Sequence, residues 1–204
     1  MNPLFVKICG VRTLEDAQLC AEAGADAIGF NFWPGSKRFV TVEAAAEIAR
    51  ALPLTLRRFG VFVDAEADLI DRAFASGAID TAQLHGDEPP EVCARFAPHY
   101  VKALRLRDEG SFSAMDRYDC ELLLVDADAP GYGGSGVLAD RSLARRAAAK
   151  RRVLLAGGLT ADNVAQAVRE VAPFGVDVAG GVERAPGIKD ARKVAAFVAA
   201  AKMR

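Results

Sequence analysis

This 204-residue chain lacks the features that mark several large protein classes. It has no apolar run near the roughly 20 residues of a membrane span, and no basic-then-apolar signal segment follows Met1. We therefore expect a cytoplasmic protein with no membrane partner. Lysine and arginine number 26 against 27 aspartate and glutamate, a formal net charge of -1. Because a nucleic-acid-binding face needs a basic surplus, we expect no nucleic-acid partner either.

Metal and disulfide patterns are also missing. The four cysteines, at positions 9, 20, 93 and 120, include no C-x-x-C pair and have no histidine pair nearby, which argues against a structural zinc site. A disulfide framework is not expected in a chain this long with 51% hydrophobic residues. Asp126 and Asp128 form a D-x-D pair, but two carboxylates without a further hard ligand are a weak metal signal. We expect no metal site.

Strand-like and helix-like segments alternate along the whole chain. The predicted strands are mostly continuous apolar runs, typical of parallel strands buried on both faces. They are Phe5–Cys9, Ala27–Phe32, Arg58–Val63, Thr81–His85, Tyr100–Leu106, Glu121–Asp126, Arg152–Ala156 and Val176–Val178. The predicted helices are Leu14–Ala23, Val42–Leu52, Ala65–Ala75, Glu91–Phe96, Gly110–Met115, Asp140–Lys150, Ala161–Val171 and Ala191–Ala201.

Eight strands alternating with helices over about 200 residues predict an α/β protein with a single (β/α)₈ TIM barrel. A doubly wound open sheet is the competing topology, but its G-x-G-x-x-G fingerprint is absent after the first strand. No linker, internal repeat or low-complexity stretch interrupts the pattern, so one domain over residues 1–204 is expected.

Two strand-like runs near the C-terminus end in glycine pairs, Gly157-Gly158 and Gly180-Gly181. Glycine-rich strand ends leave backbone N–H groups that can face a ligand oxyanion. The last two βα loops of a (β/α)₈ barrel are a frequent phosphate site. The two pairs therefore predict a phosphorylated small molecule as the partner.

Chemistry in such a barrel lies at the carboxyl ends of the strands. Those ends carry one thiol, an imidazole, an arginine and several carboxylates, including Cys9, Arg38, His85, Asp126 and Asp177. That set suits proton transfer on a sugar phosphate, with an acid to open a ring and a base to take a C–H proton. There is no Ser-His-Asp order with a nucleophile elbow.

Five motifs in register resemble the signatures of the phosphoribosylanthranilate isomerase family, and the resemblance runs from residue 7 to residue 190. They are Lys7-Ile8-Cys9-Gly10, Gln83-Leu84-His85-Gly86, Asp126 with Gly133-Gly134-Ser135-Gly136, Leu155-Ala156-Gly157-Gly158-Leu159, and Asp177-x-x-x-Gly181-Val182-Glu183 with Gly187-x-Lys189-Asp190. The resemblance implies a (β/α)₈ enzyme of tryptophan biosynthesis. It also implies the Amadori rearrangement of N-(5-phosphoribosyl)anthranilate, an intramolecular aldose–ketose isomerisation, without cofactor or metal.

The resemblance also implies residue roles. Cys9 matches the general base, Asp126 the general acid, and Arg38 the arginine that pairs with the anthranilate carboxylate. The phosphate cradle corresponds to Gly157, Gly158, Gly180 and Gly181. Further substrate-binding positions correspond to Gln83, His85 and Asp177.

Three features of the sequence depart from the family pattern. Lys37 stands where the family often has proline, Gly180 where it usually has serine, and Val137-Leu138-Ala139-Asp140 where an aromatic segment is often found. Because Gly180 lacks a hydroxyl but keeps its backbone N–H, we expect phosphate binding to survive.

We expect a monomer in preference to a homodimer.

Two other functions stay open at this point. One is a different sugar-phosphate isomerase or lyase on the same barrel. In the histidine-pathway isomerase the first strand would end in aspartate where this chain has Cys9, and the lysine and glutamate set of the indole-forming enzyme is not found. The other is a phosphate-binding barrel without turnover, which loss of Cys9 or Asp126 would favour; both are present.

Overall fold

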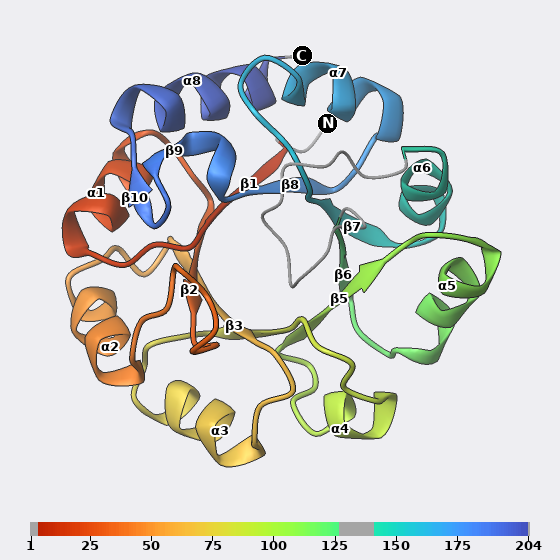
Figure 1. Ribbon diagram of the computed structural model, residues 1–204, viewed down its shortest axis with the longest axis horizontal. Coiled ribbons are helices and arrows are strands. Elements are labelled where there is room, and N and C mark those ends of the chain that lie inside the picture. Colours follow the sequence, from red (N-terminus) through yellow and green to blue (C-terminus); the bar gives the residue numbers. More distant parts are fainter. Residues whose placement is uncertain (1–3, 127–140, 204) are drawn as a thin grey trace.

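The computed structural model of the chain describes residues 4–126 and 141–203. Eight parallel strands close into one barrel in the order β1 to β8, and helices α1 to α8 surround it (Figure 1). This confirms the predicted (β/α)₈ barrel. None of the helices in the described ranges has both the length and the apolar character of a membrane span.

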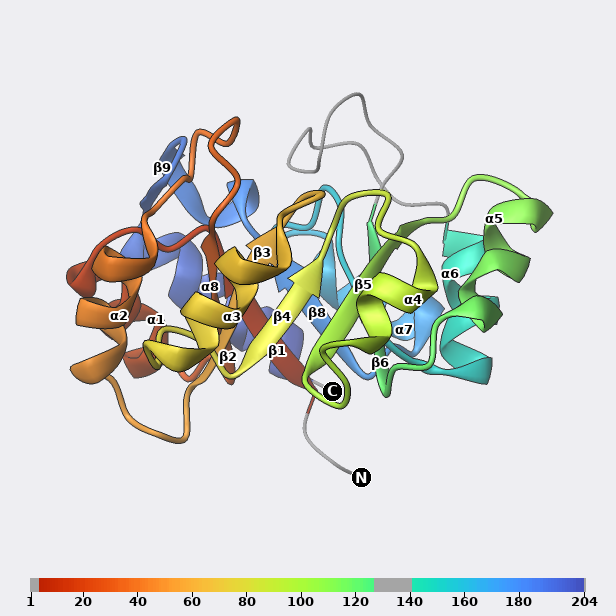
Figure 2. The ribbon, with the colours of Figure 1, turned by 90° about the horizontal axis from the view of Figure 1, so that it is seen from below.

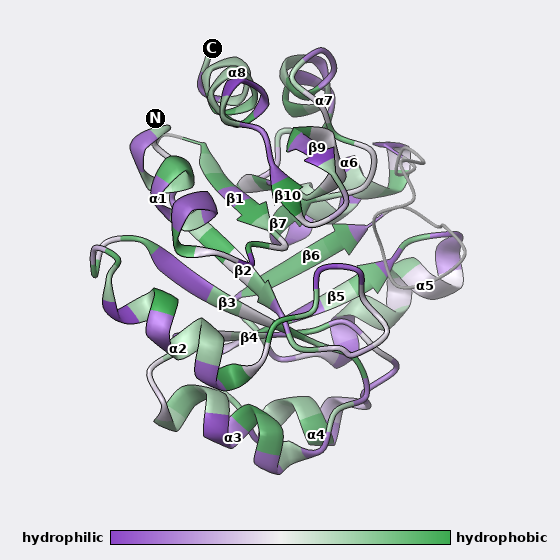
Figure 3. Ribbon diagram, turned by 60° about the vertical axis from the view of Figure 1, so that its left-hand side comes forward, coloured by the Kyte–Doolittle hydropathy of each residue, from purple (hydrophilic) through white to green (hydrophobic). Residues whose placement is uncertain are grey.

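Every predicted strand end lies within one residue of the observed one. The strands are β1 Phe5–Cys9, β2 Ala27–Asn31, β3 Arg57–Phe62, β4 Thr81–Leu84, β5 Tyr100–Arg105, β6 Leu122–Asp126, β7 Arg152–Leu155 and β8 Gly175–Val178. Their residues are mostly buried, since the barrel interior covers one face and the helices cover the other. In Figure 3 the strands β2 and β6 are largely hydrophobic, whereas the helices around them mix hydrophobic and hydrophilic residues.

The helices are α1 Leu14–Glu22, α2 Val42–Arg50, α3 Ala67–Ala75, α4 Pro90–Ala94, α5 Glu109–Ala114, α6 Arg141–Lys150, α7 Val164–Val171 and α8 Ala191–Lys202. The predicted start of α7 at Ala161 was wrong. Asn163 accepts a hydrogen bond from the Thr160 N–H and donates one to the Gly158 carbonyl, both at 2.9 Å. These bonds close a turn after β7, so the helix begins three residues later, with Asn163 as its N-cap.

A short hairpin between β8 and α8 was not predicted. A three-residue 3-10 helix, Gly180–Val182, follows β8 and leads into β9 Glu183–Ala185, which pairs antiparallel with β10 Ile188–Lys189. Figure 2 shows β9 at the upper edge of the barrel, where the strands end, beside the loop that follows β2. The hairpin therefore lies at the edge where chemistry is expected.

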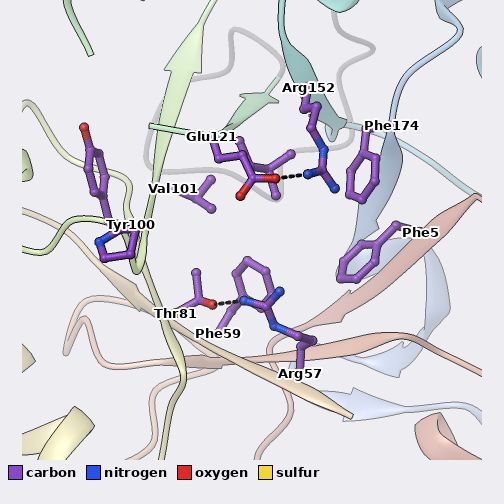
Figure 4. Close-up of a pocket in the computed structure, with 11 residues that line it drawn as sticks. Phe5, Arg57, Phe59, Thr81, Tyr100, Val101, Glu121, Arg152 and Phe174 are labelled. Carbon is purple, nitrogen blue, oxygen red and sulfur yellow. Dashed lines mark hydrogen bonds and ion pairs between the residues drawn. The ribbon is translucent and has the colours of Figure 1, made fainter. Parts of the chain in front are cut away.

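The opposite, amino-terminal end of the barrel holds a separate pocket (Figure 4). The Phe5 and Phe174 rings stack there with centroids 5.5 Å apart, and an ion pair joins Arg152 to Glu121. All these residues lie at or just before strand starts, so the pocket is remote from the carboxyl ends of the strands.

Candidate active site

The period-2 alternation of the strands places the predicted residues in two inward-facing layers. Cys9 ends β1 and Asp126 ends β6, while His85 follows β4; the exposed fractions are 9%, 7% and 9%. Gln83 lies two residues before His85, and its side chain is one layer deeper, at 1% exposure. Since inward-facing side chains of neighbouring strands meet inside a barrel, these groups converge at its mouth.

Cys9 shares its surroundings with a buried ion pair. The Lys7 Nζ lies 2.7 Å from the Asp177 Oδ1, and the two residues are paired in register on β1 and β8. A Cβ added to Gly29 would lie 3.0 Å from the Cys9 Sγ and 3.2 Å from the Lys7 Nζ, so glycine at this position leaves room for both groups. The two side chains therefore share one small space inside the barrel.

Opposing effects set the pKa values of Cys9 and Lys7. Burial raises the pKa of the Cys9 thiol, and the Lys7 ammonium partly offsets that rise. Burial works to lower the pKa of Lys7, but Asp177 and Cys9 beside it raise the pKa above its ordinary value. Lys7 thus stays cationic, and its charge opposes the rise in the pKa of Cys9 that burial causes.

Two cations stand close to Cys9 in the sequence, Lys7 and Arg12, and Lys7 is the one beside it in the structure. Arg12 is exposed and packs near Gly187, where an added Cβ would lie 3.0 Å from the Arg12 Cδ. Lys7 stands two residues before Cys9, so strand alternation is the signal that turns both side chains to the same face.

His85 links Gln83 to Asp126. The Gln83 Nε2 lies 2.8 Å from the His85 Nδ1, and the His85 Nε2 lies 3.3 Å from the Asp126 Oδ2. If the amide donates to Nδ1, the imidazole proton sits on Nε2 and faces the carboxylate. The 3.3 Å contact lacks hydrogen-bond geometry, and among the described residues neither the His85 Nε2 nor the Gln83 Oε1 has a hydrogen-bond partner. Both buried atoms are suited to a ligand's hydroxyl groups.

Arg38 reaches the site from the loop after β2. The Arg38 Nε and Nη2 each donate to one carboxylate oxygen of Glu183 at 2.8 Å, and this contact raises the pKa of Arg38. Its stem lies over Gly10, where an added Cβ would come within 2.3 Å of the Arg38 Cδ. The side chain remains 16% exposed, and neither bond to Glu183 uses Nη1. The guanidinium thus keeps an edge that can meet a second carboxylate.

The two glycine pairs lie against each other. Gly157 and Gly158 both have positive φ, 89° and 62°, a conformation that favours glycine. A Cβ added to Gly181 would lie 1.9 Å from the Leu159 carbonyl oxygen, so the loop after β8 packs directly on the loop after β7. By contrast, a Cβ added to Gly180 would meet the Arg38 Nη2 at an ordinary 3.5 Å.

Some predicted features lie outside the described residues, namely Asp128, the Gly133–Gly136 motif and the segment Val137–Asp140. Two functional candidates received no role from the sequence, Glu183 and Lys189. Both were recognised only as parts of a motif, and their partners are far away in the chain. The described residues contain no group of three or more His, Cys, Asp or Glu side chains that could hold a metal ion.

Comparisons with known proteins agree with the geometry. The model of the N-(5'-phosphoribosyl)anthranilate isomerase family matches residues 6–200. A relative of that name from Pelobacter propionicus is 48% identical over 198 residues, which cover 97% of this chain and 95% of the relative.

Solved structures give the same result. The phosphoribosyl anthranilate isomerase of Thermotoga maritima superposes with a TM-score of 0.91 at 40% identity, covering 98% of both chains. Another phosphoribosyl anthranilate isomerase structure, in complex with reduced 1-(o-carboxyphenylamino)-1-deoxyribulose 5-phosphate, has a TM-score of 0.87 at 37% identity, again covering 98% of both chains. The chain therefore belongs to the N-(5'-phosphoribosyl)anthranilate isomerase family, and it is an isomerase of tryptophan biosynthesis that carries out the Amadori rearrangement of N-(5-phosphoribosyl)anthranilate.

Proposed function

We propose that Cys9 is the general base and Asp126 the general acid of this rearrangement. The observation that carries the proposal is the placement of both side chains on the inner face of the barrel, each as the last residue of its strand. A substrate bound over the barrel mouth would have the Asp126 carboxyl group on one side and the Cys9 thiol on the other. Acid and base on separate strands can act on different atoms of one sugar.

The reaction begins at the furanose ring oxygen. Asp126 donates a proton to that oxygen, the bond from the oxygen to C1 breaks, and the anthranilate nitrogen shares its electron pair with C1 to form an iminium ion. The iminium acidifies the C2 hydrogen, which the Cys9 thiolate removes to give an enaminol. Tautomerisation of the enaminol, with a proton gained at C1 and one lost from the C2 hydroxyl, yields the aminodeoxyketose with no net change in atoms.

The order of these steps follows from the charges around Cys9. Burial raises the pKa of the thiol, and Lys7 only partly offsets it. An iminium formed next to the thiol adds a second positive charge, which favours the thiolate when it is needed. When Asp126 has donated its proton it is a carboxylate, so it can accept a proton back in a later step.

Substrate binding divides between three groups of residues. We assign the anthranilate carboxylate to Arg38, and the sugar hydroxyls to Gln83, His85 and Asp177. The phosphate is assigned to the backbone N–H groups of Gly157, Gly158, Gly180 and Gly181. The related structure in complex with a carboxyphenylamino-deoxyribulose phosphate supports a ligand that has a carboxylate at one end and a phosphate at the other.

Replacing Arg38 by lysine should raise KM by about 10- to 100-fold, since lysine cannot reproduce a bidentate contact with a carboxylate. Inorganic phosphate should inhibit this variant competitively with an unchanged Ki, because its site is the glycine cradle. Steady-state loss of the fluorescence of the anthranilate adduct measures both constants. Loss of phosphate inhibition in Arg38→Lys would mean that the two ends of the substrate are reversed in our assignment.

Replacing Gly181 by alanine should have the complementary effect and abolish phosphate inhibition. The added Cβ would lie 1.9 Å from the Leu159 carbonyl oxygen, so the two loops of the cradle must move apart. Gly180→Ala is the matched control, because within residues 4–126 and 141–203 its Cβ meets only the Arg38 Nη2, at 3.5 Å, and inhibition should persist. Phosphate Ki and the circular dichroism melting temperature are measured for both variants. Equal phosphate Ki values in Gly181→Ala and Gly180→Ala would contradict the assignment of the phosphate to the glycine cradle.

We also propose that the enzyme acts as a monomer in the cytoplasm, as the sequence analysis favours. Light scattering coupled to size-exclusion chromatography measures the mass of the particle directly, and a mass near twice the 21.6 kDa of the chain would reject the monomer.

A further inference from the structure

The hairpin after β8 contributes two buried charged side chains that the proposed mechanism does not use. Glu183 begins β9 and Lys189 ends β10, with exposed fractions of 6% and 3%. Burying charges away from water is unfavourable unless they are paired and hydrogen-bonded. Their contacts therefore show what these two residues hold in place.

Glu183 is the centre of a three-residue contact. Its carboxylate accepts the two 2.8 Å bonds from Arg38, and its Oε1 accepts a third from the Lys189 Nζ at 2.9 Å. Burial works to raise the pKa of Glu183, but these two cations lower it below its ordinary value. The carboxylate is thus held in the ionised form that a bidentate contact with arginine requires.

Lys189 joins the same contact to the strand that carries the base. Its Nζ donates to the Cys9 carbonyl at 2.6 Å and to the carbonyl of Ala179, the residue after β8, at 3.4 Å. One ammonium group therefore bonds both to the backbone of Cys9 and to the carboxylate that orients Arg38. The hairpin β9–β10 therefore links the position of the Cys9 backbone to the position of the Arg38 guanidinium.

The geometry of the Arg38 contact determines which edge of the guanidinium is presented. Two parallel bonds from Nε and Nη2 fix the plane of the guanidinium, and the stem is confined over Gly10. The edge left for a second carboxylate is the one that carries Nη1. A single hydrogen bond, or none, would leave the group free to rotate about its side-chain torsions.

We propose that Glu183, held in turn by Lys189, is a positioning residue that orients Arg38 and thereby sets the selectivity for a substrate with a carboxylate on its aromatic ring. The proposal rests on the assignment of Arg38 to that carboxylate. Glu183 itself does not touch the substrate; it acts through Arg38.

The test compares two substrates, the anthranilate adduct of ribose 5-phosphate and the aniline adduct, which lacks the carboxylate. Product formation is followed by chromatography, and the ratio of the two kcat/KM values is the selectivity. Glu183→Gln should lower this ratio by about 10- to 100-fold, because glutamine keeps the shape but can accept only one bond from Arg38. The Ki of inorganic phosphate should not change, since the cradle does not involve the Glu183 carboxylate.

Lys193→Met is the matched control. The Lys193 Nζ donates to the backbone carbonyl of Glu183 at 2.8 Å, so this change removes a bond to the same residue without touching its carboxylate. Selectivity should stay at the wild-type level. An equal loss of selectivity in Lys193→Met would show that general loosening of the hairpin, and not the carboxylate, is responsible, and would overturn the proposal.

Arg38→Ala separates failure of this inference from failure of the proposed function. If Arg38→Ala leaves the selectivity unchanged, the assignment of Arg38 is wrong. If Arg38→Ala loses selectivity but a folded Glu183→Gln keeps it, only the positioning role is wrong. The double variant should be no less selective than Arg38→Ala, because both changes act on one contact. If Glu183→Gln does not fold, Glu183→Asp gives the same comparison, since it keeps the charge beside Lys189 but shortens the reach to Arg38.

Discussion

Cys9→Ala is expected to lower kcat by about 10²- to 10⁴-fold with little change in KM. A group that removes a proton in the transition state contributes little to binding of the ground state, so the effect falls on turnover. Cys9→Ser should retain trace activity at most, because a hydroxyl is a far weaker base than a thiol at neutral pH. The measurement is the steady-state loss of the fluorescence of the anthranilate adduct.

Cys20→Ala is the control for this experiment. Cys20 is fully buried on α1, outside the barrel interior, and burial raises its pKa to about 12. Removing its sulfur tests the effect of a small cavity in the core without removing a base. Turnover near the wild-type value in Cys9→Ala would reject Cys9 as the base.

Asp126→Asn is expected to cause the second large loss of turnover. Asparagine keeps the shape of the side chain but cannot donate the proton that opens the furanose ring, so kcat should fall by about 10²- to 10⁴-fold. Binding of the product should persist, because the Arg38 contact and the glycine cradle are unchanged. Turnover is measured as for Cys9, and product affinity by titration calorimetry on the variant.

Asp128→Asn completes this experiment, although Asp128 lies outside the described residues. Asp126 ends β6 on its inner face, with the His85 Nε2 3.3 Å from its Oδ2. That placement favours Asp126 as the acid. A larger loss of turnover in Asp128→Asn than in Asp126→Asn would show that the wrong carboxylate was chosen.

The strands could be predicted closely because their signal is local. Most are apolar runs bounded by glycine or polar residues, and alternation then turns Lys7 and Cys9, or Leu124 and Asp126, to one face. The start of α7 could not be found in the same way. Thr160 is an acceptable N-cap in sequence, but the Asn163 amide bridges Gly158 and Thr160 and delays the helix.

The sequence by itself determined the barrel, the edge at which chemistry occurs, and the residue types that meet there, because strand periodicity and glycine pairs are encoded within a few neighbouring residues. Only the tertiary structure decided which charges pair inside the site. Lys7 meets Asp177 170 positions later, Arg38 meets Glu183 145 positions later, and Lys189 reaches back 180 positions to the Cys9 carbonyl. Closure of the barrel brings β8 and its hairpin against β1, and no local pattern specifies which buried cation will meet which carboxylate across that junction.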